Sequence, residues 1–294
     1  MRRFAIVEAP SILGLKPTGV ETLPDTLLAN GLAERLNAGR AARVEPLQYS
    51  TDRDPLTLTL NAQEISVYSP RLADAIGSVL DKGEFPLVLG GDCSILLGSM
   101  LALRRRGRYG LFFIDGHADF YQPEVNPNGE AASMDLAFAT GRGPAIVTDM
   151  EGRCPLVRDE DSVAFAFRDA EEQARYGSQP LPPALLALDL ARVRQFGAEA
   201  GAREAVRHLT RENGPDGGFW VHLDADVLDD TIMPAVDYRM PDGLSWTELI
   251  AVLRIAMDSG RAVGIEVTIY NPKLDPDGAS GQGLTATLVE ALGG

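Results

Sequence analysis

Strand-like apolar runs alternate with amphipathic segments from one end of the chain to the other. The expected strands are Phe4–Val7, Arg43–Leu47, Pro86–Leu89, Gly110–Ile114, Val163–Phe167, Leu185–Leu188, Trp220–Leu223 and Ala262–Val267. The expected helices are Thr26–Leu36, Pro70–Leu80, Ser94–Arg105, Ala191–Arg211, Ser245–Ser259 and Leu284–Leu292. This alternation predicts the α/β fold class, with a mostly parallel sheet covered by helices on both faces in a three-layer α/β/α arrangement.

Nothing in the sequence marks a boundary between domains. No Pro/Ser-rich linker, shift in composition or internal repeat divides the 294 residues, so we expect residues 1–294 to form a single domain. A net charge of −15 argues against nucleic acid and anionic membranes as partners and leaves a small-molecule substrate. No run approaches the roughly 20 apolar residues of a membrane span. Two cysteines give no disulfide framework, and we therefore expect a cytoplasmic protein.

Two acidic clusters stand directly after apolar runs, Leu111–Ile114 and Phe219–Leu223. Their titratable residues are Asp115, His117 and Asp119 in the first cluster and Asp224 and Asp226 in the second. An apolar run of this kind is typical of a buried parallel strand, and ligands of open α/β sheets bind at the carboxyl ends of such strands. One interpretation is that these residues are helix caps and turn formers. The other is that crowded carboxylates enclose a cation.

The histidine in the first cluster favours the metal interpretation. Asp115, His117 and Asp119 alternate, so their side chains would share one side of an extended segment. Mixed carboxylate and imidazole ligands suit Mn, Fe, Co, Ni or Zn better than Ca or Mg. Together with Asp224 and Asp226, these residues could hold two divalent ions, which activate water at neutral pH and polarise an electrophile. His222 lies two residues before Asp224 on the same strand face, which suggests a role beside the ligands.

Four short motifs occur in order along the chain. They are Gly-Gly-Asp-Cys-Ser (90–94), Asp-Gly-His-Ala-Asp (115–119), Asp-Ala-Asp-Val-Leu-Asp (224–229) and Tyr-Asn-Pro (270–272). This series resembles the signature segments of the arginase/agmatinase (ureohydrolase) family. The resemblance implies a single α/β domain, a two-manganese centre, hydrolysis of a C–N bond in a guanidinium-type substrate, and assembly into homotrimers or hexamers.

The resemblance also implies roles for individual residues. Asp115 and Asp224 would bridge the two metals, His117 and Asp226 would complete one metal, and Asp119 would complete the other. Asp119 would also accept a hydrogen bond from the attacking nucleophile, and Asp226 would act in catalysis by holding its ion.

Cys93 stands where the family has a metal-binding histidine. Its thiolate could ligate, and because sulfur is a soft donor the site would then favour zinc or iron over manganese. Alternatively, Cys93 is a small buried residue and one metal binds weakly. We therefore expect two divalent ions, with manganese as the first expectation and zinc, iron, cobalt or nickel as alternatives.

The family's proton-shuttling histidine, expected beyond Asp119, is absent from the segment Gly129–Asp135. Glu130 or Asp135 could take over the acid–base work, and we name Glu130 as the catalytic candidate. Either residue could equally be part of the first turn of the following helix, where a carboxylate interacts favourably with the helix dipole.

Ile269 occupies the position of the glutamate that pairs with the guanidinium group in the family. Glu266 lies upstream and, at strand periodicity, on the opposite side. Loss of a charged bidentate partner should weaken guanidinium binding strongly. The remaining substrate-binding candidates are Tyr121, Glu171, Asp237 and Arg239.

The sequence thus predicts a binuclear-metal hydrolase of the ureohydrolase family. Its substrate would be a small amidine, guanidine or amide other than arginine. Two alternatives remain: a catalytically impaired binding or regulatory protein on the same fold, and an amide hydrolase of the deacetylase type on a related fold.

Overall fold

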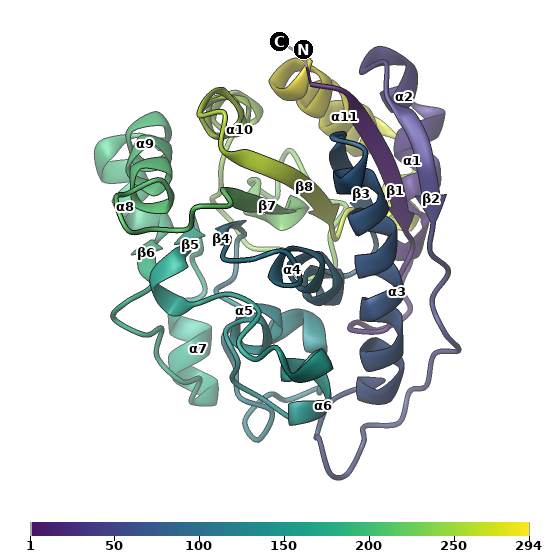
Figure 1. Cartoon of the computed structure of the whole chain (residues 1–294), viewed down its shortest axis with the longest axis vertical. Helices are drawn as coiled ribbons and strands as arrows, with labels where there is room; N and C mark the ends of the chain where they lie inside the picture. Colours follow the sequence, from purple (N-terminus) through teal and green to yellow (C-terminus); the bar gives the residue numbers. More distant parts are fainter. Residues whose placement is uncertain (1, 294) are drawn as a thin grey trace.

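The computed structural model describes residues 2–293, which contain one sheet of eight parallel strands (Figure 1). The strands are β1 (Phe4–Ala9), β2 (Gly39–Arg43), β3 (Phe85–Gly90), β4 (Gly110–Ile114), β5 (Ser162–Phe165), β6 (Leu186–Leu188), β7 (Phe219–Asp224) and β8 (Ala262–Thr268). Their order across the sheet is β2-β1-β3-β8-β7-β4-β5-β6. The predicted α/β fold class is confirmed.

Helices cover both faces of the sheet. One face carries α1 (Leu23–Ala29), α2 (Leu32–Arg35), α8 (Leu190–Phe196), α9 (Ala198–Leu209), α10 (Trp246–Asp258) and α11 (Ala279–Leu292). The other face carries α3 (Ala62–Asp81), α4 (Leu96–Arg104), α5 (Asp135–Ala139) and α6 (Ala145–Thr148), while α7 (Ala170–Tyr176) follows β5 and buries no residue (Figure 1). Strand side chains alternate between the two cores: in β1, Phe4 and Ile6 enter one core and Ala5 and Val7 the other. None of the helices between residues 2 and 293 is long and apolar enough to cross a membrane.

Two predicted helices are each interrupted by a glycine. The expected helix Thr26–Leu36 is α1 and α2, which are separated at Gly31, where φ is +82°. The expected helix Ala191–Arg211 is α8 and α9, which are separated at Gly197, where φ is +89°. Positive φ breaks a right-handed helix, and glycine adopts it at no steric cost.

The second strand lies earlier in the chain than the predicted range, Arg43–Leu47. The sheet edge is formed by Gly39–Arg43, whose side chains are mostly exposed and therefore carry no apolar pattern. The apolar residues Val44 and Leu47, which suggested the strand, lie beyond it and pack half-buried against the core under α3.

Gly264 of β8 has no side chain and therefore leaves space for the indole ring of Trp220 on the neighbouring strand β7. A Cβ atom at position 264 would overlap the ring of Trp220, which is fully buried. We expect Gly264→Ala to lower the free energy of unfolding by about 1–3 kcal/mol, the usual cost of overpacking. Gly39→Ala is the matched strand control, because no atom of residues 2–293 lies within 4 Å of its added Cβ. Equal denaturant midpoints for the two variants would contradict this packing.

Candidate metal centre

The acidic clusters meet at the carboxyl edge of the sheet because β4 and β7 are adjacent. Their pairing brings Ile114 opposite Leu223, so the residues that follow, Asp115 and Asp224, lie side by side. Both carboxylates are buried, as is Asp226 in the turn after β7.

Local hydrogen bonds fix one oxygen of each carboxylate. Asp115 Oδ1 accepts from the main-chain NH of His117 at 2.6 Å, and Asp224 Oδ1 accepts from that of Asp226 at 2.7 Å. Asp226 Oδ1 accepts from the NH of Gly116 at 3.0 Å, which ties the two clusters together. Of the second oxygens, Asp224 Oδ2 lies 2.8 Å from Cys93 Sγ and Asp226 Oδ2 lies 2.9 Å from His117 Nδ1, while Asp115 Oδ2 has no hydrogen-bond partner in residues 2–293.

Two groups of potential ligand atoms result, and the atoms of each group lie close enough together to hold one cation. The first group is Cys93, Asp115, His222 and Asp224, and the second is Asp115, His117 and Asp226; within each, all ligand atoms lie within 4.8 Å of one another. Asp115 belongs to both groups. Its Oδ2 is buried and has no hydrogen-bond partner in residues 2–293, as expected of an oxygen that awaits a cation. These donors fit a pair of divalent ions.

The electrostatics of the cluster support a cation. Burial, with repulsion from neighbouring aspartates, raises the pKa of Asp115 and of Asp224 well above the ordinary value. Burial would also raise the pKa of Asp226, but His117, whose Nδ1 lies 2.9 Å from Asp226 Oδ2, holds it below its ordinary value. Although burial opposes it, Asp226 raises the pKa of His117 to about 10. A metal would therefore displace protons from these groups as it binds.

A pocket opens from the cluster toward solvent. Around the ligands it is lined by Asp119, Tyr121, Glu172, Tyr238 and Ile269, among others. Asp119 is buried and has a φ of +45°. It belongs to neither ligand group among the described residues, but it faces the pocket beside them.

The other predicted site residues lie farther out. Glu130 is buried behind the pocket wall, where its Oε2 accepts from Tyr238 at 2.5 Å, and burial raises the pKa of its carboxyl. Asp237 accepts from the amide of Asn271. Neither Glu130 nor Asp237 is part of the lining. The same holds for Glu171, whose neighbour Glu172 is part of it, and for Arg239, which pairs with Asp230 at 3.2 Å.

Comparisons with known proteins identify the family. Residues 2–293 match the model of the arginase family. The chain belongs to this family of hydrolases. It is 25% identical to an arginase of Brevibacillus brevis, with 99% of this chain and 98% of that one covered.

Solved structures of the same fold include the arginase of Bacillus caldovelox (TM-score 0.88, 24% identity, 100% of this chain and 99% of that chain). The proclavaminate amidino hydrolase of Streptomyces clavuligerus is more distant (TM-score 0.70, 17% identity, 100% and 91% covered). The resemblance to the arginase/agmatinase family is thereby confirmed.

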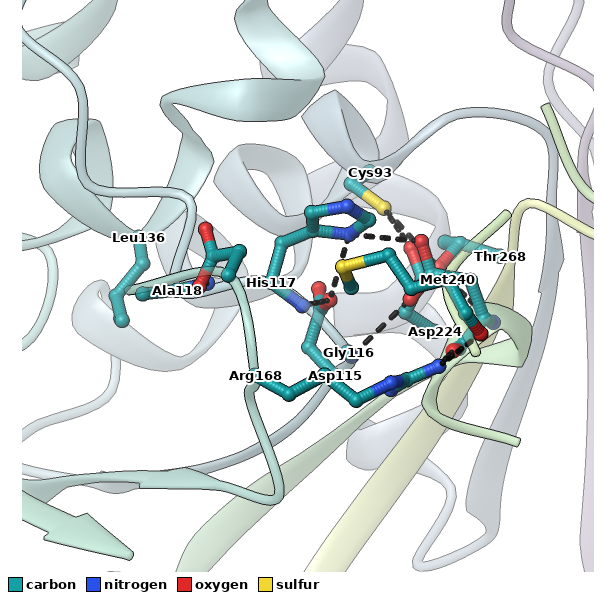
Figure 2. Close-up of polar contacts among 12 residues, drawn as sticks. Cys93, Asp115, Gly116, His117, Ala118, Leu136, Arg168, Asp224, Met240 and Thr268 are labelled. Atoms are coloured by element: carbon teal, nitrogen blue, oxygen red, sulfur yellow. Dashed lines mark hydrogen bonds and ion pairs between the residues drawn. The ribbon is translucent and has the colours of Figure 1, made fainter. Parts of the chain in front are cut away.

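Cys93, the first departure from the arginase family pattern, lies inside the cluster. Its Sγ is 2.8 Å from Asp224 Oδ2 and 3.3 Å from Thr268 Oγ1 (Figure 2). Burial, followed by the charge of Asp224, raises the pKa of the thiol well above its ordinary value, so it is a proton donor to Asp224 until a cation arrives. Its position fits the ligand interpretation.

Substitutions of Cys93 should change the metal preference. We expect Cys93→His to raise manganese affinity, because imidazole is a harder ligand, and Cys93→Ser to lose one of two bound equivalents on dialysis. Inductively coupled plasma mass spectrometry after dialysis against manganese and zinc measures both. If neither variant changes stoichiometry or preference, Cys93 is a packing residue.

Ile269, the second departure, turns into the pocket through an unusual backbone conformation. Its φ is +71°, a genuine outlier for a β-branched residue, and its NH donates to the carbonyl of Gly91 at 2.9 Å. Its side chain is buried in the pocket wall. Glu266 is absent from this lining, as predicted, but it lies below the metal cluster with His222.

Three residues have contacts that sequence patterns did not show. Asp135 is fully buried with a free Oδ2, and burial and then Asp119 raise its pKa well above the ordinary value. The Arg168 guanidinium donates to the carbonyl oxygens of Asp226 (2.9 Å) and Met240 (3.2 Å) and so holds the turn after β7 in place. His222 belongs to a ligand group, whereas alternation alone suggested only a supporting role.

Proposed function

We propose that this protein is a binuclear-metal hydrolase that cleaves a C–N bond in a small amidine, guanidine or amide. One observation carries the proposal: Asp115 is shared by two ligand groups that open into the same pocket. Two cations that share one carboxylate can together activate a water molecule and polarise a poor electrophile.

The residues of the centre would divide between metal binding and orientation of the attacking water. Asp115 would hold both ions, Asp224 would hold one of them with Cys93, and His117 and Asp226 would hold the other. The resemblance implied a bridging role for Asp224 as well, but Asp224 belongs to one ligand group only, and Asp119 lines the pocket beside both groups. The bound ions would acidify a water molecule and polarise the carbon under attack. Asp119 would accept a hydrogen bond from that water and so orient it.

The proton needed by the leaving amine would have a different source from the family's histidine. Glu130 is the candidate, because burial raises the pKa of its carboxyl and Tyr238, its hydrogen-bond partner, lines the pocket. In this role the Tyr238 hydroxyl, which donates to Glu130, would turn to give its own proton to the leaving amine and receive the Glu130 proton on its oxygen.

The pocket wall disfavours arginine as the substrate. Ile269 presents an apolar surface where a guanidinium counter-ion is expected, and Tyr121 and Tyr238 complete an aromatic lining. Tyr121, with a buried hydroxyl that has no partner in residues 2–293, would donate to or accept from the substrate. Three predicted substrate-binding residues lie outside the pocket lining and would contact only a longer substrate: Glu171, Asp237 and Arg239.

Manganese is the first expectation for the native metal, with zinc, iron, cobalt or nickel favoured to the extent that Cys93 ligates. Assembly into a homotrimer or hexamer and a cytoplasmic location complete the proposal, on the basis of the family.

A second candidate is a binding protein that does not turn over a substrate. The missing shuttle histidine and the apolar Ile269 favour it.

A panel of amides, amidines and guanidines, incubated with the metal-loaded protein and assayed for released amine, distinguishes the hydrolase from the binding protein. We expect metal-dependent release from at least one compound and none from Asp119→Asn. Saturable ligand binding with two metals present and no release from any compound would favour the binding protein.

A further inference from the structure

A chain of three buried polar side chains lies directly beneath the metal cluster. Ser99 of α4 donates to Glu266 Oε2 at 2.5 Å, and Glu266 Oε1 lies 2.8 Å from His222 Nδ1. All three residues are fully buried. The imidazole is also stacked on the ring of Phe113, with centroids 4.5 Å apart and planes at 6°. The position and tilt of this imidazole are therefore fixed by contacts on two sides.

The hydrogen bonds determine which nitrogen of His222 is free. Because the Glu266 carboxylate is an acceptor, Nδ1 carries the imidazole proton and donates a hydrogen bond to Glu266, which leaves a lone pair on Nε2. This Nε2 lies 3.8 Å from Asp115 Oδ2. Both atoms are buried and neither has a hydrogen-bond partner in residues 2–293. A cation between these two buried, facing acceptors would satisfy both.

The same nitrogen completes a ligand set. Cys93 Sγ, a carboxylate oxygen from each of Asp115 and Asp224, and an imidazole nitrogen of His222 lie within 4.8 Å of one another. One sulfur, one nitrogen and two oxygens suit a four-coordinate zinc, cobalt or ferrous ion better than manganese.

We infer that His222 is a direct metal ligand in this protein and replaces, from the strand below, the imidazole that Cys93 does not supply. Glu266 and Ser99 are positioning residues that hold its tautomer and orientation. The inference rests on the proposed binuclear centre and adds to it a specific ligand and a preference for a thiophilic metal at one of the two sites.

Because the chain contains only three histidines, nuclear magnetic resonance can test the ligand directly. The full-length protein, labelled with ¹⁵N-histidine, is loaded with ¹¹³Cd²⁺, a cation that accepts thiolate, imidazole and carboxylate ligands. We expect cadmium–nitrogen coupling at His222 Nε2, a proton retained on its Nδ1, and coupling at His117. His208 is the internal control, because its Nε2 is 2.8 Å from the main-chain oxygen of Glu160.

The outcomes distinguish failure of the His222 assignment from failure of the binuclear centre itself. Coupling at His117 but not at His222 would overturn the inference and leave the binuclear centre intact. Absence of coupling at both would overturn the inference and the proposed function together.

Variants give an independent readout that does not depend on activity. We expect His222→Gln to lose one of two metal equivalents on dialysis and to lose the intense visible absorption of four-coordinate cobalt, whereas His208→Gln keeps both. Glu266→Gln and Ser99→Ala should retain the ligand but weaken cobalt binding, by about 10–100-fold for Glu266→Gln. An unchanged cobalt spectrum in His222→Gln would contradict direct ligation, and if that variant does not fold, the wild-type resonance experiment still decides.

Discussion

Asp115→Asn should abolish metal binding at both sites, with loss of all metal-dependent hydrolysis. Asp115 is the residue common to both ligand groups, and its unpartnered Oδ2 faces the space between them. An amide offers a neutral oxygen in place of a charged one, so each ion would lose a ligand and a neutralising charge. Metal content per chain, measured by plasma mass spectrometry after dialysis, should fall from two equivalents to near zero.

The same variant should not weaken the metal-free fold. A folded-state pKa raised above its unfolded value means that the carboxyl contributes stability at low pH, which is lost as the pH rises through the folded value. At pH values above the unfolded pKa the carboxyl therefore costs the metal-free protein free energy, and Asn removes this cost. We expect the melting temperature of chelator-treated Asp115→Asn to equal or exceed that of chelator-treated wild type.

Asp161→Asn is the matched control at the opposite edge of the sheet. Asp161 is equally buried, precedes β5 and pairs with Arg108 at 2.6 Å and Arg211 at 2.9 Å. Its replacement should lower the melting temperature and keep both metals. If Asp115→Asn kept two equivalents, the bridging role of Asp115 would be wrong.

Arginine and agmatine should be hydrolysed at a negligible rate even with saturating manganese. Ile269 leaves the guanidinium group without a counter-ion in a buried wall. Breaking a buried ion pair by removing one partner costs about 3–5 kcal/mol, which is about 10²–10³-fold or more in kcat/KM. A colorimetric urea assay over a wide range of enzyme concentration measures the rate. Rapid urea formation from arginine would contradict this prediction and the role given to Ile269.

Ile269→Glu should raise urea formation from arginine only in part, because the shuttle histidine is also missing. The positive φ at this position strains a β-branched residue more than an unbranched one, so the substitution should not destabilise the backbone. Ile269→Gln is the control of equal size without the charge. A gain with Glu and none with Gln would assign the effect to the carboxylate.

The sheet and its acidic edge could be predicted because buried parallel strands carry an unbroken apolar signal. The run before Asp115 and the run before Asp224 belong to β4 and β7, which pair at the centre of the sheet. The edge strand Gly39–Arg43 could not be predicted in this way, since its exposed side chains have no apolar pattern. The short helices α5 and α6 are stabilised by packing against the core, and their segments are too brief for a helical period to appear.

The ligand role inferred for His222 depends on a contact between strands that no sequence pattern shows. Alternation placed His222 on the face of Asp224, but only the register of β7 with β8 places Glu266 beside it and turns its free nitrogen toward Asp115. Ile269 is similar, because the positive φ that turns it into the pocket is set by its bond to Gly91. In both cases the decisive partner is remote in sequence.

Anomalous scattering from crystals of the metal-loaded protein tests the central claim most directly. We predict two anomalous peaks per chain, both in contact with Asp115. One peak should lie beside Cys93, His222 and Asp224, and the other beside His117 and Asp226. A single peak, or two peaks of which neither contacts Asp115, would contradict it.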